Sequence, residues 1–237
     1  MTKVGLQLYT LRGESARDFE RVLRAVAEIG FDGVELFDLH GHEAGDVRAL
    51  LDELGLEVAG RHVGADADLA AVAEEMRTLG SNRVALAWVD PPSSADEARA
   101  VAALVAERAQ RAAEVGLSYG FHNHWAELEV FDGVTALELI AELPVWLELD
   151  LGWIWWAGVD PVEQLERYRG RTPLVHVKDI RVRGSREFTT VGDGGVGYER
   201  VLPEADVEWL IVEQDEIDGD PYEAVRRSFE FTRAVPA

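Results

Sequence analysis

The sequence predicts a single-domain α/β protein with a (β/α)8 barrel fold over residues 1–237. Short apolar runs of β-type residues alternate with longer amphipathic stretches, and the pattern repeats at about 30 residues a unit, the size of one βα step. Such alternation implies parallel strands joined by helical crossovers, and eight units favour a closed barrel. An open doubly wound sheet is the alternative. Against it, residues 8–14 carry no glycine fingerprint for a dinucleotide.

The strands are predicted from apolar runs at Val4–Tyr9, Gly33–Phe37, Glu57–Val63, Arg83–Trp88, Leu117–His122, Val145–Leu149, Leu174–Val177 and Val207–Val212. Apolar side chains at helical spacing predict helices at Asp18–Ile29, Ala44–Leu54, Ala67–Leu79, Ala95–Val115, about Val134–Glu142, Pro161–Tyr168, Tyr198–Leu202 and Pro221–Arg233. Glycines follow the first four of these helices at the position that commonly ends a helix. Each strand is thus paired with a helix of its own.

Composition and charge exclude several classes of protein. Asp and Glu number 45 against 23 Lys and Arg, so the formal net charge is −22, and a field of that sign repels nucleic acids and anionic membranes. The absence of cysteine excludes disulfides and thiolate metal sites. No run of about 18 apolar residues predicts a membrane span. Residues 1–6 lack the pattern of a signal peptide, so a cytoplasmic protein is expected.

Polar side chains gather at the predicted carboxyl ends of the strands, where barrel enzymes carry their chemistry. These are Glu35, His62, His122, Asn123, His124, Glu148, Asp150, His176, Lys178, Asp179 and Glu213. The remaining two histidines, His40 and His42, follow the second strand and are expected in solvent or at the substrate rim. No histidine lies on a predicted helix, so the histidines are concentrated at one end of the barrel.

Side chains two residues apart on a strand share a face, so Glu148 and Asp150 can both point into the barrel mouth. Inward charges among Val, Leu and Ile are costly unless they are paired or bound to metal. A metal ion shared by Asp150, His176 and Glu213 explains their convergence. His62 is left open between a hydrogen-bonded core residue and a functional one.

Two acidic features are interpreted as structural. Asp179 is expected to cap a loop or to pair with Arg181. The segment Asp215–Asp220 is expected to be a solvated turn, since it lacks the spacing of a calcium loop.

Tryptophans are unusually dense between residues 125 and 156. Trp125, Trp153 and Trp155 or Trp156 fall in segments expected to be loops that rim the mouth. Sugar rings stack their C–H surfaces on aromatic faces, so a small-molecule carbohydrate or polyol is the expected partner. Packing between helices is the alternative interpretation, and a contact between copies of the chain, in a homo-oligomer, also stays open.

Several segments together resemble the sugar phosphate isomerase/epimerase group, the xylose isomerase-like TIM-barrel family. They are Gly5–Arg12, Gly30–Glu35, Gly120–His124, Glu148–Asp150, Gly158–Pro161, His176–Asp179, Phe188–Gly194 and Ile211–Asp215. Each segment alone is unspecific, whereas their order and spacing along nearly the whole chain are typical of the family. The resemblance implies the barrel fold and an enzyme of sugar metabolism.

The resemblance also implies one divalent ion, Mn²⁺, Co²⁺, Mg²⁺ or Zn²⁺, held by a Glu, an Asp, a His and a Glu from the last four strands. Asp150, His176 and Glu213 match three of these ligands. The common Glu-Asn-His of the fifth strand is His122-Asn123-His124 here, as in the branch related to inosose dehydratases. His122, Glu148 or a water could therefore fill the fourth position.

The expected activity is a metal-dependent isomerase or epimerase that abstracts a proton next to a carbonyl and passes through an enediolate. His124 is the expected base because imidazole titrates near neutral pH, with His122 and Glu213 as alternatives. Lys178 is expected to take part in the reaction and to hold substrate oxygens. The other expected substrate contacts are Glu35, His62, Trp125 and Trp153.

Three other activities are weighed against this one. Loss of a hydroxyl or glycosyl group from the same enediolate would make the protein a lyase or dehydratase. Phosphodiester hydrolysis with a three-ion cluster, as in the apurinic endonucleases of this fold, needs more than the six histidines present, and the net charge opposes DNA. A sugar-binding barrel without catalysis is disfavoured by the ligand candidates on three strands.

Overall fold

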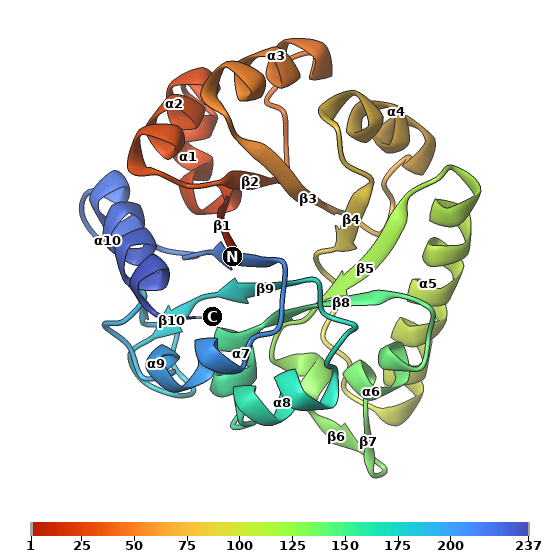
Figure 1. Cartoon of the computed structure of the whole chain (residues 1–237). Coiled ribbons are helices and arrows are strands. Elements are labelled where there is room, and N and C mark those ends of the chain that lie inside the picture. Colours follow the sequence, from red (N-terminus) through yellow and green to blue (C-terminus); the bar gives the residue numbers. More distant parts are fainter. Residues whose placement is uncertain (1, 237) are drawn as a thin grey trace.

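The barrel prediction is confirmed by the structure, a computed structural model that describes residues 2–236. Eight parallel strands close in the order β1-β12-β9-β8-β5-β4-β3-β2. Their bounds are Lys3–Gln7 for β1, Gly33–Leu36 for β2, Glu57–Val63 for β3, Arg83–Leu86 for β4, Ser118–His122 for β5, Trp146–Asp150 for β8, Leu174–Val177 for β9 and Trp209–Val212 for β12. Figure 1 shows these strands at the centre and the helices around them.

The surrounding helices cover the outer face of the barrel with their apolar sides. They are α1 (Arg12–Ser15), α2 (Phe19–Ile29), α3 (Ala44–Leu54), α4 (Leu69–Leu79), α5 (Ala95–Glu114), α6 (Ala136–Ala141), α7 (Leu151–Trp156), α8 (Pro161–Arg167), α9 (Tyr198–Val201) and α10 (Pro221–Ala234). Gly30, Gly55 and Gly80 end α2, α3 and α4 in the left-handed conformation, as predicted. Within residues 2–236, every helix is too short or too polar to cross a bilayer.

The interior of the barrel is layered, and this layering positions the site. Side chains two residues apart on a strand share a face. The side chains that point into the barrel are apolar in a lower layer, which we call the floor, and polar in the layer above it. On β12 the inward residues are Trp209 and Ile211, and Glu213 continues the same face just after the strand. The floor is the cluster of Ala59, Leu174, Trp209 and Ile211, against which Trp146 packs. This floor closes the barrel below its polar groups.

Glycines make room for the large rings of this floor. A Cβ at Gly33 would lie 2.7 Å from the Trp209 ring, and one at Gly120 would lie 2.4 Å from the Trp146 ring. Real Cβ atoms do not approach so closely. Both positions therefore require glycine, which leaves the space above the floor for the polar residues of the strand ends.

Several local predictions are wrong at the carboxyl ends of the strands. The first strand ends at Gln7 rather than Tyr9, because the Gln7 side chain accepts a hydrogen bond from the Tyr9 N–H and starts a 3-10 helix, Leu8–Leu11. The segment with Trp153, Trp155 and Trp156, expected to be a loop, is α7. Asp150 begins this helix because its side chain accepts the Trp153 N–H.

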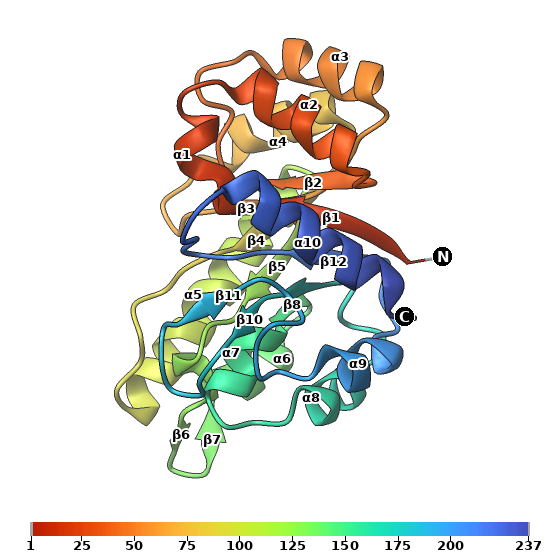
Figure 2. The same cartoon turned by 90° about the vertical axis from the view of Figure 1, so that its left-hand side faces the viewer.

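Two small hairpins were not predicted. One is formed by β6 (Val130–Phe131) and β7 (Val134–Thr135), which replaces the expected start of the helix at Val134. Figure 2 shows this hairpin projecting from the body of the barrel. The other is formed by β10 (Asp179–Ile180) and β11 (Phe188–Thr189), in the segment after β9. Both are too short to show an alternating pattern in the sequence.

Candidate active site

Neighbouring strands bring the predicted polar residues level with one another at the carboxyl end of the barrel. Asp150 on β8 pairs in register with His176 on β9, and His122 on β5 pairs with Glu148 on β8. Glu213 follows directly after β12 and donates its backbone N–H to Val177 O of β9. Residues far apart in the sequence thus share one layer because the closed sheet fixes their heights.

Four of these side chains form what we call the ligand cluster: His122, Asp150, His176 and Glu213. Each offers one ligand atom within 4.8 Å of the others, and all four residues are buried. His176 Nδ1 lies 2.8 Å from Glu213 Oε2, and His122 Nε2 lies 4.0 Å from Asp150 Oδ2. The structure therefore brings the predicted metal ligands together, and their binding of an ion stays a prediction.

The donor atoms of the ligand cluster fit a divalent ion. Within residues 2–236, the buried Asp150 Oδ2 has no hydrogen bond of good geometry, whereas Oδ1 accepts the Trp153 N–H at 2.8 Å. Burial raises the pKa of Asp150 to about 6. A buried oxygen that accepts no hydrogen bond has a lone pair open to an ion, and mixed carboxylate and imidazole ligands suit Mn²⁺, Co²⁺, Mg²⁺ or Zn²⁺.

Lys178 already places one positive charge against the ligand cluster. Its Nζ lies 3.1 Å from Asp150 Oδ2, 3.0 Å from Glu213 Oε2 and 2.9 Å from Asp215 Oδ1. Burial opposes the charge of Lys178, but these carboxylates outweigh it and raise the lysine pKa well above its usual value. The ammonium therefore balances two of the proposed ligands and competes with an ion for them.

Asp215 corrects the prediction of a solvated turn over Asp215–Asp220. The backbone bends after Glu213, and the Asp215 carboxylate turns inward to the Lys178 ammonium instead of facing solvent. The signal was present in the sequence, because Glu213 and Asp215 are two residues apart and Glu213 was placed in the mouth.

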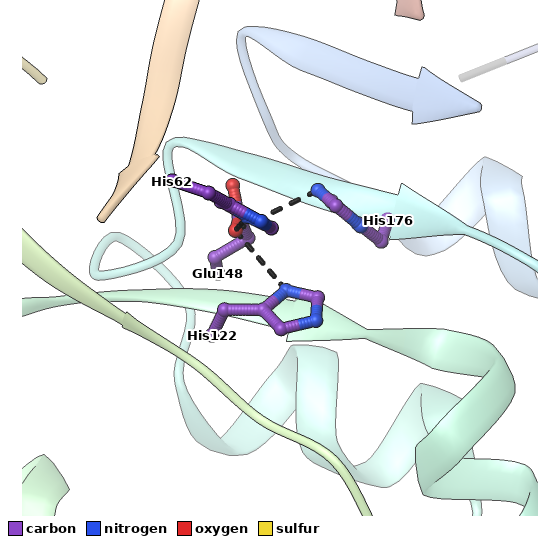
Figure 3. A group of neighbouring side chains, drawn as sticks. All are labelled: His62, His122, Glu148 and His176. Carbon is purple, nitrogen blue, oxygen red and sulfur yellow. Dashed lines mark hydrogen bonds and ion pairs between the residues drawn. The ribbon is translucent and has the colours of Figure 1, made fainter. Parts of the chain in front are cut away.

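A second cluster lies beside the first and shares two of its imidazoles. Figure 3 shows the Glu148 carboxylate among the rings of His62, His122 and His176. Glu148 Oε2 is 2.5 Å from His62 Nε2, 3.1 Å from His122 Nδ1 and 3.6 Å from His176 Nε2. The two clusters face opposite ring nitrogens of His122 and His176. Glu148 therefore orients rings whose other nitrogens face the ligand cluster.

Glu35 lies deeper than expected for a substrate contact. Its carboxylate is fully buried, and Oε2 accepts hydrogen bonds from Gln7 Nε2 and from His176 Nε2, both at 2.7 Å. Burial raises the pKa of Glu35 to about 7, and the nearby Glu148 charge adds to this rise. The structure does not place Glu35 in the cavity lining, so it serves better to orient His176.

Carboxylates on both sides hold the His176 ring charged in the absence of an ion. Burial disfavours its charge, but Glu148, Glu213 and Glu35 outweigh burial and raise the His176 pKa well above its usual value. Burial likewise opposes the charge of Glu213, which Lys178 and His176 outweigh, so its pKa is lowered well below the usual value. An ion bound at His176 must therefore displace a proton.

A cavity of about 500 Å³ opens above the clusters. One wall is polar, with His122, Lys178 and Glu213, and the other is aromatic, with Trp88, Trp125, Trp153 and Phe188. His62 also lines the cavity, and its role as a substrate contact stays a prediction. The aromatic wall comes from the segments after four strands, and Trp88 and Phe188 in it were not singled out from the sequence. A polar wall that faces an aromatic wall suits an amphipathic ring.

His124 lines the cavity beside the ligand cluster, and its role as a base stays a prediction. Its ring lies 4.9 Å from the His122 ring and 4.8 Å from that of Trp88, centroid to centroid. Its backbone is fixed, because the N–H donates to Glu127 Oε2 and the carbonyl accepts from Asn123 Nδ2. Burial, with the His122 and Lys178 charges, lowers the His124 pKa well below its usual value. The ring is therefore neutral at neutral pH.

Two side chains fix the segments that carry the site. Asn123 Oδ1 accepts the Asp150 N–H at 3.0 Å, which ties β5 to β8. Asp179 accepts N–H groups from Gly192, Gly194 and Val196, which confirms the loop cap and gives no pairing with Arg181. These bonds hold the ends of three strands at the rim of the cavity.

Fold and site together define a TIM-barrel protein with a carboxylate–imidazole centre at the carboxyl end of its strands, the usual place of active sites in this fold. The sequence profile described as Xylose isomerase-like TIM barrel matches residues 23–235. The chain therefore belongs to this family, and the resemblance of its sequence motifs is confirmed.

Two curated relatives match most of the chain. The rhizopine catabolism protein MocC of Rhizobium meliloti is 28% identical over 250 residues, which cover 86% of this chain and 76% of that protein. The inosose dehydratase of Geobacillus kaustophilus is 26% identical over 273 residues, covering 90% and 85%. A solved sugar phosphate isomerase/epimerase of Parabacteroides distasonis has the same fold, with a TM-score of 0.80 at 22% identity, covering 100% and 95%.

Proposed function

We propose that this protein is an enzyme that modifies a sugar or polyol carrying a carbonyl group, by moving a proton next to that carbonyl. The general kind, a sugar-modifying enzyme, is supported by relatives that include inosose dehydratases and by membership in the xylose isomerase-like family. The cavity, with its polar wall and its aromatic wall, suits such a substrate. Its position at the carboxyl end of the strands agrees with the place of catalysis in this fold.

His122, Asp150, His176 and Glu213 would hold one divalent ion. When bound, the ion would polarise the substrate carbonyl and an adjacent hydroxyl and so acidify the neighbouring C–H. Glu35 and Glu148 keep the imidazoles of His176 and His122 turned toward the ligand cluster. Lys178, which lines the cavity, would hold a substrate oxygen once an ion takes its place between the carboxylates.

The observation that carries the proposal is the neutral imidazole of His124 beside the ligand cluster. A base must have a free lone pair at working pH and must reach the substrate proton. His124 lines the cavity, and no side-chain hydrogen bond to its ring nitrogens occurs within residues 2–236. Glu213 is the alternative base, but its carboxylate is held by Lys178 and His176.

Two outcomes follow from proton removal. Return of the proton gives isomerisation or epimerisation, which is the reaction we propose first. Loss of a β-hydroxyl from the same enediolate gives dehydration, and the similarity to the inosose dehydratase of Geobacillus kaustophilus over 90% of the chain favours this second candidate.

Solvent exchange tests the proposal without knowledge of the natural substrate. The Mn²⁺-loaded protein is incubated in D₂O with 2-keto-myo-inositol or D-fructose, and loss of the proton next to the carbonyl is followed by NMR. We expect exchange by the wild type and a loss of about 10²–10⁴-fold in His124→Gln with metal content unchanged, the usual effect of removing a general base. His122→Gln should lose metal and exchange together.

His42→Gln is the matched control, because His42 is exposed and does not line the cavity. It should exchange at the wild-type rate. Wild-type exchange in His124→Gln would show that the base is another group, and full activity of the wild type in excess chelator would refute the role of the ion.

A further inference from the structure

The hairpin of β10 and β11 carries a cluster of positive charge, one member of which lines the cavity. Its connecting segment, residues 181–187, carries Arg181, Arg183 and Arg186 with one acidic residue, Glu187, in a chain whose net charge is −22. The segment is held in place, because Trp156 Nε1 donates to Ser185 O at 2.6 Å. This basic segment lies at the mouth of a protein with a negative net charge, so the electrostatic potential there is locally opposite in sign to that of the whole protein.

The hairpin arginines have no acidic partner within residues 2–236, which they share with the exposed Arg21, Arg77 and Arg226 but not with many other exposed arginines. Arg200 and Arg227, for example, pair with Asp160 at 2.9 Å and with Asp193 at 2.7 Å. Within residues 2–236, none of the three hairpin guanidinium groups lies within 4.0 Å of a carboxylate. Asp and Glu outnumber Lys and Arg, 45 to 23, so carboxylates are abundant, and three unpaired arginines within six residues set this segment apart.

Arg186 is the hairpin arginine that faces the cavity. Its guanidinium lies 5.0 Å from the Trp125 ring and 5.9 Å from the Trp153 ring, in the aromatic wall. Arg183 instead lies 4.8 Å from Trp155 and does not line the cavity. A guanidinium stacked on an aromatic face keeps the N–H donors at its edge, and these match the two oxygens of a carboxylate or phosphate.

The other charges of the cavity leave Arg186 available to a ligand. Glu213 and Asp215 are both paired with Lys178. Glu216 is exposed at the rim, and Arg12 donates to Tyr9 O on the side of β1. The acidic groups of the polar wall are thus paired with the lysine, and among residues 2–236 no carboxylate lies within hydrogen-bonding range of the guanidinium groups of Arg12 and Arg186.

We propose that Arg186, stacked on Trp125, is a subsite for an oxyanion of the substrate, so that the substrate is a polyhydroxy carbonyl compound with a carboxylate or phosphate group. This inference rests on the proposed function and adds the substrate class to it. Long-range repulsion by the net charge weakens the approach of anions, and a local cation at the mouth offsets it. The oxyanion binds at the rim, and the carbonyl end of the same molecule reaches His124 and the ligand cluster.

Binding by three probes tests the subsite. D-gluconate, D-glucose 6-phosphate and the neutral D-glucitol are titrated calorimetrically into the Mn²⁺-loaded wild type, Arg186→Gln and Arg183→Gln. We expect at least one anion to bind the wild type more tightly than glucitol and Arg186→Gln to weaken that anion by roughly 10–100-fold, as for a lost hydrogen bond to a charged group. Glucitol binding should stay unchanged. Preference for gluconate or for the phosphate identifies the oxyanion.

Arg183→Gln is the matched control, because it removes the same charge from the same hairpin outside the cavity. It should bind anions within about twofold of the wild type, and added salt should weaken anion binding to the wild type. The subsite is refuted if the wild type binds no anion more tightly than glucitol, if Arg186→Gln keeps the preference, or if Arg183→Gln loses as much. Metal content is measured in parallel, so that failure of the ion site is distinguished from failure of the subsite.

Discussion

Asp150 carries a buried carboxyl group whose charged form the fold disfavours when no ion is bound. The rise of its pKa from 3.8 to about 6 corresponds to roughly 3 kcal/mol. A raised pKa means that the folded state holds the proton more tightly than the unfolded state. The contribution of Asp150 to the free energy of unfolding is therefore fully present below about pH 4. It is lost as the pH rises to about 6, and it is absent at higher pH.

Asp150→Asn removes this charge and keeps an oxygen for the N–H of Trp153, which begins α7. Lys178 retains Glu213 and Asp215 as partners. We expect the metal-free variant to exceed the metal-free wild type in stability by up to about 3 kcal/mol near pH 8, or roughly 6 °C in Tm for a chain of this size. Thermal unfolding in chelator from about pH 4 to 8 measures the difference, which should shrink toward the acidic end.

Asp160→Asn is the control with the opposite sign. Asp160 also begins a helix, α8, by accepting the Val162 N–H, but a hydrogen bond from Arg200 lowers its pKa. Its charge therefore stabilises the fold, and the variant should be less stable than the wild type near pH 8. The reasoning is refuted if Asp150→Asn destabilises the metal-free protein at that pH, or if its effect does not depend on pH.

Three further results are expected. Chelation should abolish activity, and added Mn²⁺ or Co²⁺ should restore it. Because His176 must lose a proton to bind an ion, the metal affinity measured by chelator competition should rise by up to about tenfold per pH unit. Glu35→Gln should weaken metal binding by about 10–100-fold, since the carboxylate that orients His176 is lost, and equal affinity would contradict this. Lys178→Met should tighten metal binding, since the competing ammonium is removed; weaker binding would show that Lys178 organises the carboxylates instead.

The layer of ligands could be predicted because it depends on strand periodicity alone. Once Asp150, His176 and Glu213 are placed at strand ends, the closed sheet fixes their heights, and the structure brings them together as expected. The barrel follows from the repeated βα pattern in the same way. Neither inference needs the details of a loop.

The features that sequence did not predict depend on single side chains that redirect the backbone. The Gln7 side chain ends β1 two residues early, and Asp150 turns a supposed loop into α7. Asp215 turns inward because Lys178 offers a buried charge. Glu35 was expected at the substrate, but it pairs in register with Gln7, and its carboxylate is held by the Gln7 amide and the His176 ring inside the barrel.

The two oxygens of Asp150 link the ligand cluster to the cavity wall. Oδ1 begins α7 at the Trp153 N–H, and Oδ2 faces the proposed ion. Because both oxygens belong to one planar carboxylate, an ion that draws Oδ2 toward itself would also shift Oδ1 and the start of α7, and with it the Trp153 ring, 4.9 Å from that of Trp125. The emission of these indoles should therefore change when the centre is loaded, which gives the protein an optical reporter of its own occupancy without any label.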